Sequence, residues 1–230
     1  EDQSKYDETK RRMELIRKAI VGDPTRTVNG GPEISGFVAD VGRLPLCVAE
    51  LTSLGNEIIP ATVPRTFESP CDDTLTISEA YEDANSGLSL GWRGPYIQSL
   101  PDSNGQRRVR DGYENDDGSE NFGWGFLNNN LEIRLQSAGS NSVFDGATPL
   151  DDFPVGATVA STTPLVVEHD YNVNFRNWND VAIRLENRAA STITISQNSL
   201  RLVLSFADVS QTNALGTDTG TTIPSVNIVL

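Results

Sequence analysis

The feature that most constrains the fold is a helical hydrophobic period at the start of the chain that gives way to a period of two in its second half. Residues 4–20 contain no Gly or Pro and are rich in good helix-forming residues. Apolar side chains recur there at spacings of seven, three and four, which is typical of one helix face. This face comprises Tyr6, Met13, Ile16 and Ile20. We therefore predict an amphipathic helix that ends before Gly22 and Pro24.

Strand patterns dominate the chain beyond Leu131. Runs rich in β-branched and alternating apolar residues occupy residues 131–135, 165–167, 181–185, 192–195, 200–206 and 226–230. Because Asn, Gly and Ser separate these runs, antiparallel pairing is expected. The predicted class is α+β, with an N-terminal amphipathic helix packed on an antiparallel β-sheet and an additional β-rich C-terminal region. A short second helix is expected over Glu33 to Val41, and no regular structure is assigned around Pro60, Pro64 and Pro70.

Length and charge narrow the class of protein. The 230 residues, 37% of them hydrophobic, suffice for a core. Residues 1–145 are predicted to form a helix-plus-sheet domain, and residues 146–230 a β-rich extension that either stands alone or continues the same sheet. The net charge of −14 argues against nucleic acid and against anionic membrane surfaces as partners. The sequence contains no run of about 18 apolar residues that could span a bilayer.

Cys47 and Cys71 are the only cysteines of the chain. They lack a CxxC spacing and a neighbouring His that would complete a zinc site. The pair predicts a disulfide, which would imply an oxidising compartment outside the cytoplasm. Two unrelated buried thiols are the alternative.

The segment Gly87-Leu88-Ser89-Leu90-Gly91 matches the G-x-S-x-G pattern of a nucleophile elbow, which carries the reactive serine of many hydrolases. That motif needs a helix after the serine, whereas Gly94 and Pro95 follow closely and oppose one. His169, the only histidine, lies within a strand-like run. The sequence therefore predicts that the chain is not an enzyme.

Two acidic segments could attract a hard cation, because calcium prefers clustered oxygen ligands. The first contains Asp116, Asp117 and Glu120, but its Gly118 does not fit the register of an EF-hand loop. The second segment contains Asp145, Asp151 and Asp152. The first segment could form either a calcium site or a solvated acidic turn. No other cofactor is expected. Trp92, Trp124 and Trp178 could stack on sugars, but buried anchors are the expected role.

Four segments, read in order, resemble the pilin-like subunits of type IV pili and type II secretion systems. They are the helix of residues 6–20, the turn Gly42-Arg43-Leu44-Pro45, the segment Trp92-Arg93-Gly94-Pro95-Tyr96, and Asp111-Gly112 leading to Trp124-Gly125. The stretch of residues 137–146, SAGSNSVFDG, is similar to the end of the major pseudopilin, so the resemblance covers residues 1–145 approximately.

The sequence also departs from the major pseudopilin at two places. Tyr113 to Gly123 is inserted between the aspartate and the Trp-Gly pair, and Ser140 and Asn141 stand where an acidic calcium ligand is expected. An elaborated minor subunit therefore fits the resemblance better than the repeating one.

The resemblance implies a structural role in filament assembly. Such subunits carry an apolar N-terminal helix, absent from these 230 residues, that anchors the precursor in the inner membrane and later packs in the filament. The expected partners are other subunits of the same filament and a possible extracellular ligand, with assembly or tip capping as the task, and the expected location is periplasmic or extracellular. A secreted β-sandwich binding module or adhesin for a glycan or protein is the alternative.

Overall fold

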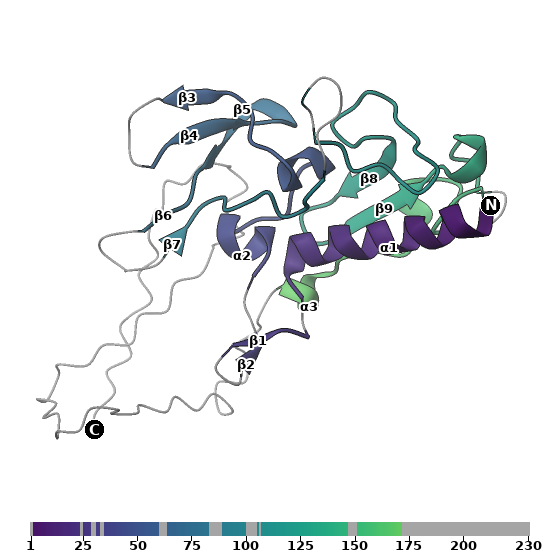
Figure 1. Cartoon of the computed structure of the whole chain (residues 1–230), viewed down its shortest axis with the longest axis horizontal. Helices are drawn as coiled ribbons and strands as arrows, with labels where there is room; N and C mark the ends of the chain where they lie inside the picture. Colours follow the sequence, from purple (N-terminus) through teal and green to yellow (C-terminus); the bar gives the residue numbers. More distant parts are fainter. Residues whose placement is uncertain are drawn as a thin grey trace, which may run out of the picture. The chain divides into compact units, whose positions relative to one another are not determined.

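The computed structural model describes most of the chain up to Tyr171 (Figure 1). The described segments are residues 2–23, 25–28, 31–32, 35–59, 64–82, 89–99, 105, 107–146 and 151–171. Contacts divide the chain into two compact units, Glu1–Asn172 and Val173–Leu230. The first unit runs past residue 145, where the sequence placed a domain boundary. The four strands predicted beyond residue 180 lie outside the described residues, as does Trp178.

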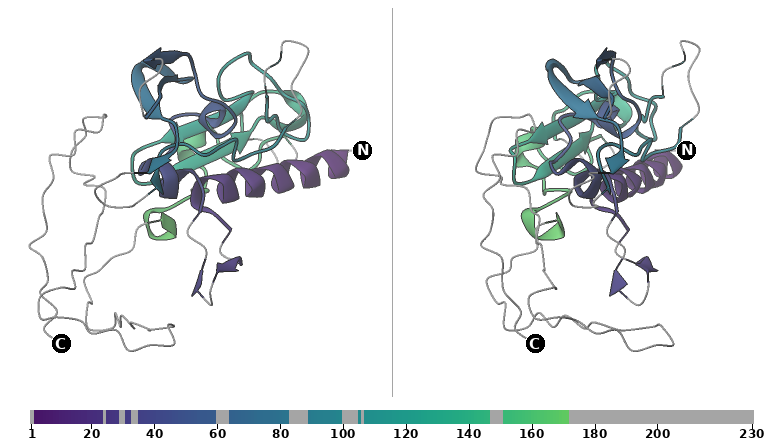
Figure 2. Two further views of the ribbon diagram at one scale, coloured as in Figure 1. Left: turned by 60° about the vertical axis from the view of Figure 1, so that its left-hand side comes forward. Right: turned by 90° about the vertical axis from the view of Figure 1, so that its left-hand side faces the viewer.

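The N-terminal helix α1 spans Asp2–Val21 and lies along the hairpin formed by strands β8 and β9 (Figures 1 and 2). Its buried residues are Thr9, Met13, Ile16, Ala19 and Ile20. Three of the four residues of the predicted packing face are thus buried, while Tyr6 is half-buried and its ring meets Phe153 edge to face. The helix ends where Gly22 adopts a positive φ of 83° and donates its N–H to the Lys18 carbonyl.

The second helix is shorter than the sequence predicted. Helix α2 spans Phe37–Val41, because Gly36 immediately before it has a φ of 96°, which is incompatible with a helix that continues through it. Gly42 ends α2 in the left-handed conformation and donates its N–H to the Val38 carbonyl. The other short helices among the described residues are the 3₁₀ turns η1 (Val48–Leu51), η2 (Gly139–Asn141) and η3 (Val159–Ser161), and helix α3 (Glu168–Tyr171).

The strands of the described residues pair in antiparallel sheets. Strand β1 (Thr27–Val28) pairs with β2 (Gly31–Pro32), and β6 (Tyr81–Glu82) pairs with β7 (Ser89–Leu90). A three-stranded sheet has the order β3 (Glu57–Ile59), β4 (Thr66–Ser69) and β5 (Asp72–Ser78). Strand β8 (Trp124–Asn128) pairs with β9 (Ile133–Ser137). The described unit is therefore α+β, with its helix first and antiparallel sheets after it.

The β8–β9 hairpin supplies the sheet side of the core. Ile133 and Leu135 of β9 are fully buried and belong to one apolar cluster with the inner face of α1. The predicted strand at residues 165–167 is instead a single antiparallel bridge, in which Val166 pairs with Ile133. The strand predicted from Leu131 begins later, at Ile133, because asparagine side chains form the turn that precedes it.

The three-stranded sheet occupies the Pro-containing region to which the sequence assigned no regular structure. Its prolines do not interrupt the ladder, because Pro70 lies in the turn between β4 and β5 and Pro64 precedes β4. Strand β5 pairs with β4 from Ser78 opposite Thr66, with a register shift near the turn. Prolines thus flank β4 on both sides without interrupting its pairing.

The predicted disulfide is present and joins Cys47 to Cys71. Cys47 lies directly before η1, and Cys71 lies in the turn between β4 and β5, so the bond ties the three-stranded sheet to the core. Cys47 is buried and Cys71 is half-buried.

Removing this bond by the double substitution Cys47→Ser and Cys71→Ser is expected to lower the free energy of unfolding by roughly 3 kcal/mol, the chain-entropy value for a loop of this length. Urea unfolding of the oxidised protein and the double variant measures the difference. Equal midpoints and slopes would contradict the expectation. Alkylation of the unreduced protein followed by mass measurement provides the control, since no thiol should react.

Candidate functional site

The turn Gly42-Arg43-Leu44-Pro45 forms a polar hub with η1. The carboxylate of Glu50 is fully buried and accepts two hydrogen bonds from the Arg43 guanidinium, at 2.7 and 2.8 Å. It also accepts the Leu46 N–H at 2.9 Å and the Ser69 hydroxyl at 2.6 Å. The hydrogen bonds described for this carboxylate therefore hold in place either the turn and the residue after it or the end of β4. No local sequence pattern indicates this hub, because Arg43 lies in the turn after α2 and Ser69 lies at the end of β4.

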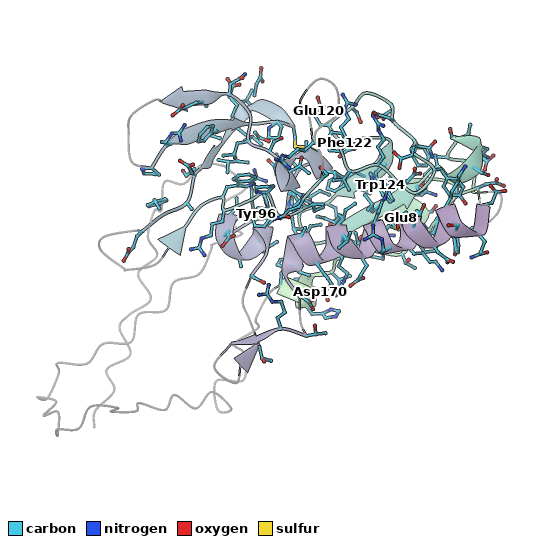
Figure 3. All side chains as sticks on the ribbon, in the orientation of Figure 1. Glu8, Tyr96, Glu120, Phe122, Trp124 and Asp170 are labelled. Carbon is cyan, nitrogen blue, oxygen red and sulfur yellow. A yellow bond between two sulfur atoms is a disulfide. The ribbon has the colours of Figure 1, made fainter. Side chains whose placement is uncertain are left out.

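The segment Trp92–Tyr96, whose Tyr96 is labelled in Figure 3, contacts both η1 and α2. The Trp92 indole N–H donates to the Glu50 carbonyl at 2.8 Å, and the Tyr96 hydroxyl donates to Asp40 at 2.9 Å. A Cβ on Gly94 would lie 2.4 Å from the Trp92 ring, so glycine is needed where the chain crosses that ring. Burial raises the pKa of Tyr96, so its hydroxyl keeps the proton that it donates. The motif thus joins α2 to η1.

Asp111-Gly112 is clamped to α1. The Gly112 N–H donates to the Thr9 hydroxyl at 3.0 Å, and Thr9 donates to the Lys5 carbonyl of its own helix. A Cβ on Gly112 would lie 2.0 Å from the Lys5 carbonyl oxygen, so a larger residue would push the loop from the helix. The Arg12 guanidinium adds a bond to the Asp111 carbonyl at 2.8 Å.

The Asp111 side chain, only 1% exposed, organises the loop that follows. Its carboxylate accepts the N–H groups of Tyr113 and Asn115, at 3.0 and 2.9 Å, and the Asn115 side-chain amide at 2.8 Å. The Ser137 hydroxyl at the end of β9 also donates to it. Asp111 therefore connects the α1-bound loop to the sheet.

Trp124 and Gly125 begin β8. The Trp124 side chain is 3% exposed and donates its indole N–H to the Val109 carbonyl at 2.7 Å, so it is not available to stack on a sugar (Figure 3). Gly125 leaves room for the Phe144 ring, which would lie 3.1 Å from an added Cβ. The pair anchors the hairpin to the segment before Asp111.

The inserted segment from Tyr113 to Gly123 contains the first set of calcium candidates. Asp116 faces two guanidiniums, with Arg108 and Arg110 each 2.8 Å from it. Asp117 accepts the Ser119 hydroxyl and N–H and the N–H of Gly123, so it stabilises the loop itself. Glu120 is exposed, and its backbone carbonyl accepts the N–H of Ala49. Asp116 and Asp117 are thus engaged by protein donors.

The second acidic segment folds around Asp152, which is fully buried and accepts the N–H groups of Asp145 and Gly146. Asp151 accepts the Ser140 hydroxyl at 3.1 Å. Within the described ranges, no three His, Cys, Asp or Glu side chains lie together in a way that could hold a metal ion.

The structure places Ser89 and His169, the two residues of the hydrolase hypothesis, in separate elements. Ser89 lies in strand β7, and the next helix among the described residues is the distant η2. His169 lies in α3, not in a strand as the sequence suggested, and its side chain is 86% exposed. Its Nε2 lies 3.9 Å from the Asp170 carboxylate, which also pairs with Arg17 of α1 at 2.9 Å; Asp170 is labelled in Figure 3.

An arginine-lined hollow that the sequence reasoning missed lies between α1 and the segments around residues 98 and 109. This arginine groove has a volume of about 510 Å³. Its charged lining residues are Arg11, Arg12, Arg108, Arg110 and Glu114. Its apolar lining residues are Leu15, Ile97 and Val109. The cluster of Arg107, Arg108 and Arg110 in an otherwise acidic chain was the sequence signal that could have revealed it.

Glu8 pairs with two of these arginines. Hydrogen bonds from Arg11 and then Arg12 lower the pKa of Glu8 to about 2. Because the folded-state pKa is depressed, the pairing stabilises the protein above about pH 4.5 and is lost as the pH falls toward 2.

Glu8→Gln is expected to reduce the free energy of unfolding at pH 7 by no more than about 1 kcal/mol, since the pair is partly screened by solvent. The difference from the unmodified protein should shrink at pH 2.5. Urea unfolding at both pH values measures it, and a difference that grows toward low pH would contradict the assigned direction.

Comparisons with known proteins found no matching family profile, no matching curated protein and no matching solved structure. No helix of the described ranges is both long and apolar enough to cross a membrane. The candidate site therefore consists of three short motifs that hold α1, α2, η1 and the β8–β9 hairpin together, and of an arginine groove beside α1.

Proposed function

We propose that the chain is the globular part of a pilin-like subunit, an elaborated minor subunit of a type IV pilus or of a type II secretion pseudopilus. In this proposal it is a structural protein that takes part in filament assembly or tip capping. It acts outside the cytoplasm and is held at the inner membrane before assembly.

The observation that carries the proposal is the clamp between Asp111-Gly112 and α1. A helix of 20 residues is buried along one face, while its ends and outer face carry charged residues. Asp111-Gly112 contacts the helix through Thr9, and Trp124 anchors the hairpin that covers it. The motif residues therefore hold one long helix against a small sheet. This arrangement suits a subunit whose helix transmits load to its globular part.

Further support comes from the disulfide and from the inserted loop. A bond between Cys47 and Cys71 suits an oxidising compartment. The insertion from Tyr113 to Gly123 is fastened to η1, because Asn121 accepts the Val48 N–H and Glu120 accepts that of Ala49. A packed elaboration of this kind suits a minor subunit with a specialised head.

The mechanism is assembly by packing. An apolar segment that continues α1 toward the N-terminus would anchor the precursor and, after cleavage, pack with its equivalents in the filament core. The surface loops of the globular part would then select neighbours or an external ligand.

The full-length gene tests the proposal. We expect a prepilin peptidase cleavage site followed by about 20 apolar residues, long enough to span a membrane, with a Glu near their start. The mature protein should then be recovered with filaments sheared from the cell surface, and deletion of the apolar segment should abolish that recovery. A conventional signal peptide ending directly before Glu1 would overturn the proposal.

A further inference from the structure

The three-stranded sheet of β3, β4 and β5 shares little apolar contact with the rest of the described unit. Ile77 of β5 is buried, yet it does not belong to the apolar cluster that contains residues of α1, η1 and the β8–β9 hairpin. Among the described apolar side chains of the three strands and the β4–β5 turn, Cys71 is the one that packs against that cluster. The sheet also lies apart from α1 in the ribbon views (Figures 1 and 2). Burial of apolar surface therefore contributes little to holding the sheet on the core.

The disulfide and a hydrogen bond hold the end of the sheet at the β4–β5 turn. The disulfide joins Cys71 to Cys47, and the Ser69 hydroxyl donates to the buried carboxylate of Glu50 at 2.6 Å. The two attachments are coupled, because the Cys71 N–H donates to the same Ser69 hydroxyl at 3.2 Å. Movement of Cys71 away from Cys47 therefore also disturbs the bond between Ser69 and Glu50.

Backbone hydrogen bonds to Trp92 attach the opposite end of β5. The Trp92 N–H donates to the Ser78 carbonyl at 2.8 Å, and the Ala80 N–H donates to the Trp92 carbonyl at 3.1 Å. Because β5 has seven residues and a strand rises about 3.3 Å per residue, these bonds lie roughly 20 Å along the strand from the turn. They therefore do not restrain the turn itself.

The core has contacts of its own that do not involve the sheet. Arg43 bonds the Glu50 carboxylate, and the Trp92 indole N–H bonds the Glu50 carbonyl. The Gly112 N–H donates to Thr9 of α1, and β8 pairs with β9 along its whole length. These contacts all remain when the disulfide is broken.

The two cysteines of the disulfide differ in exposure. Cys47 is 3% exposed, whereas Cys71 is half-buried and lines a hollow of about 470 Å³ beside the β4–β5 turn. Cys47 is not among the residues that line this hollow. Thiol–disulfide exchange begins when a thiolate reaches one sulfur atom of the bond, so Cys71 is the accessible target and Cys47 is the leaving group.

We propose that the disulfide is a redox-controlled attachment of the three-stranded sheet: a dithiol reductant cleaves it at Cys71, and the sheet then separates from a core that stays folded. One thiolate of the reductant attacks the Cys71 sulfur and forms a mixed disulfide, while Cys47 leaves as a thiolate and takes up a proton. The second thiolate of the reductant then attacks its partner sulfur in the mixed disulfide, which releases Cys71 as a thiol and leaves the reductant as a disulfide. Two electrons and two protons thus pass from the dithiol to the protein. The proposal does not depend on the chain being a filament subunit.

Amide hydrogen exchange of the full chain, before and after reduction with dithiothreitol, tests the proposal. The disulfide contributes to the stability of the whole chain, so reduction accelerates exchange in both sheets, and the ratio between them reports local separation. The ratio of the exchange rates of β4 and β5 amides to those of β8 and β9 should rise at least about tenfold on reduction. A ratio that reduction leaves unchanged would overturn the proposal.

Alkylation distinguishes local separation from unfolding of the whole unit. In reduced protein freed of dithiothreitol without oxygen, iodoacetamide should modify Cys71 at least about tenfold faster than Cys47, because Cys47 stays in the folded core. Equal rates for the two thiols would contradict a core that stays folded. Brief treatment of the oxidised protein with 2-mercaptoethanol, quenched with acid, should place the mixed disulfide on Cys71, and an adduct on Cys47 would refute the assigned point of attack.

Two variants separate the disulfide from the neighbouring hydrogen bond. The double variant Cys47→Ser/Cys71→Ser should show the high exchange ratio of the reduced protein with or without dithiothreitol, and the proposal fails if its ratio is that of the oxidised protein. Ser69→Ala removes the bond to Glu50 but keeps the disulfide. In its oxidised form the ratio should stay close to that of the unmodified chain. If oxidised Ser69→Ala instead shows the high ratio, the hydrogen bond holds the sheet and the proposal is wrong.

Discussion

Replacing Arg43 with alanine is expected to lower the free energy of unfolding by about 3–5 kcal/mol, the cost of leaving a buried carboxylate without its cation. Glu50 is fully buried, and Arg43 supplies two of its four hydrogen bonds. Without the guanidinium, the charge on Glu50 stays in the interior with only the Leu46 N–H and the Ser69 hydroxyl. Urea unfolding followed by circular dichroism measures the loss.

An exposed arginine provides the control for this prediction. Arg65 also pairs with two carboxylates, Glu57 and Glu79, but its side chain is 46% exposed. Arg65→Ala should therefore cost less than about 1 kcal/mol. The double variant Arg43→Ala/Glu50→Gln should regain part of the stability lost in Arg43→Ala, because it removes the buried charge. Equal losses for Arg43→Ala and Arg65→Ala would show that the hub contributes little.

Asp111→Ala should have a comparable effect, a loss of about 3–4 kcal/mol, because it leaves several buried donors unsatisfied at once. The donors are two backbone N–H groups, the Asn115 amide and the Ser137 hydroxyl. Ser137 is fully buried, so water cannot readily replace the carboxylate there. Thermal unfolding and urea titration of the variant measure the loss.

Asp72 offers a matched control, since it makes a similar local turn with Thr74 but is exposed. Asp72→Ala should change the free energy of unfolding by less than about 1 kcal/mol, as is usual for surface substitutions and exposed caps. If Asp111→Ala proves as mild as Asp72→Ala, then Asp111 does not link the α1-bound loop to β9 in the way its contacts indicate.

The sequence predicted best where short-range physics decides the structure. The apolar stripe at Met13, Ile16 and Ile20 identified the helix and most of its buried face, because side chains three and four positions apart share one side of a helix. Gly22 and Gly42 ended their helices as expected, since each adopts a positive φ that other residues disfavour. The disulfide could be predicted because the chain has only two cysteines, Cys47 and Cys71.

The three-stranded sheet shows where local patterns failed. Prolines argued against regular structure, yet Pro64 and Pro70 lie outside the strands, and pairing between β4 and β5 decides the conformation there. Conversely, the apolar run at residues 165–167 suggested a strand, but only Val166 pairs, through one bridge to Ile133. In both places, pairing with another segment of the chain decides the conformation more than local strand propensity does.

What the sequence by itself determined is therefore the N-terminal helix, its stop at Gly22, the α+β class and the disulfide. Only the tertiary structure decided how the motif residues are used. Gly112 meets Thr9 across 103 positions of sequence, and Arg12 gains its place in the arginine groove only when Arg110 lies beside it. Such contacts depend on how α1 and the following loops pack, because their partners are brought together by burial of the core and not by their spacing along the chain.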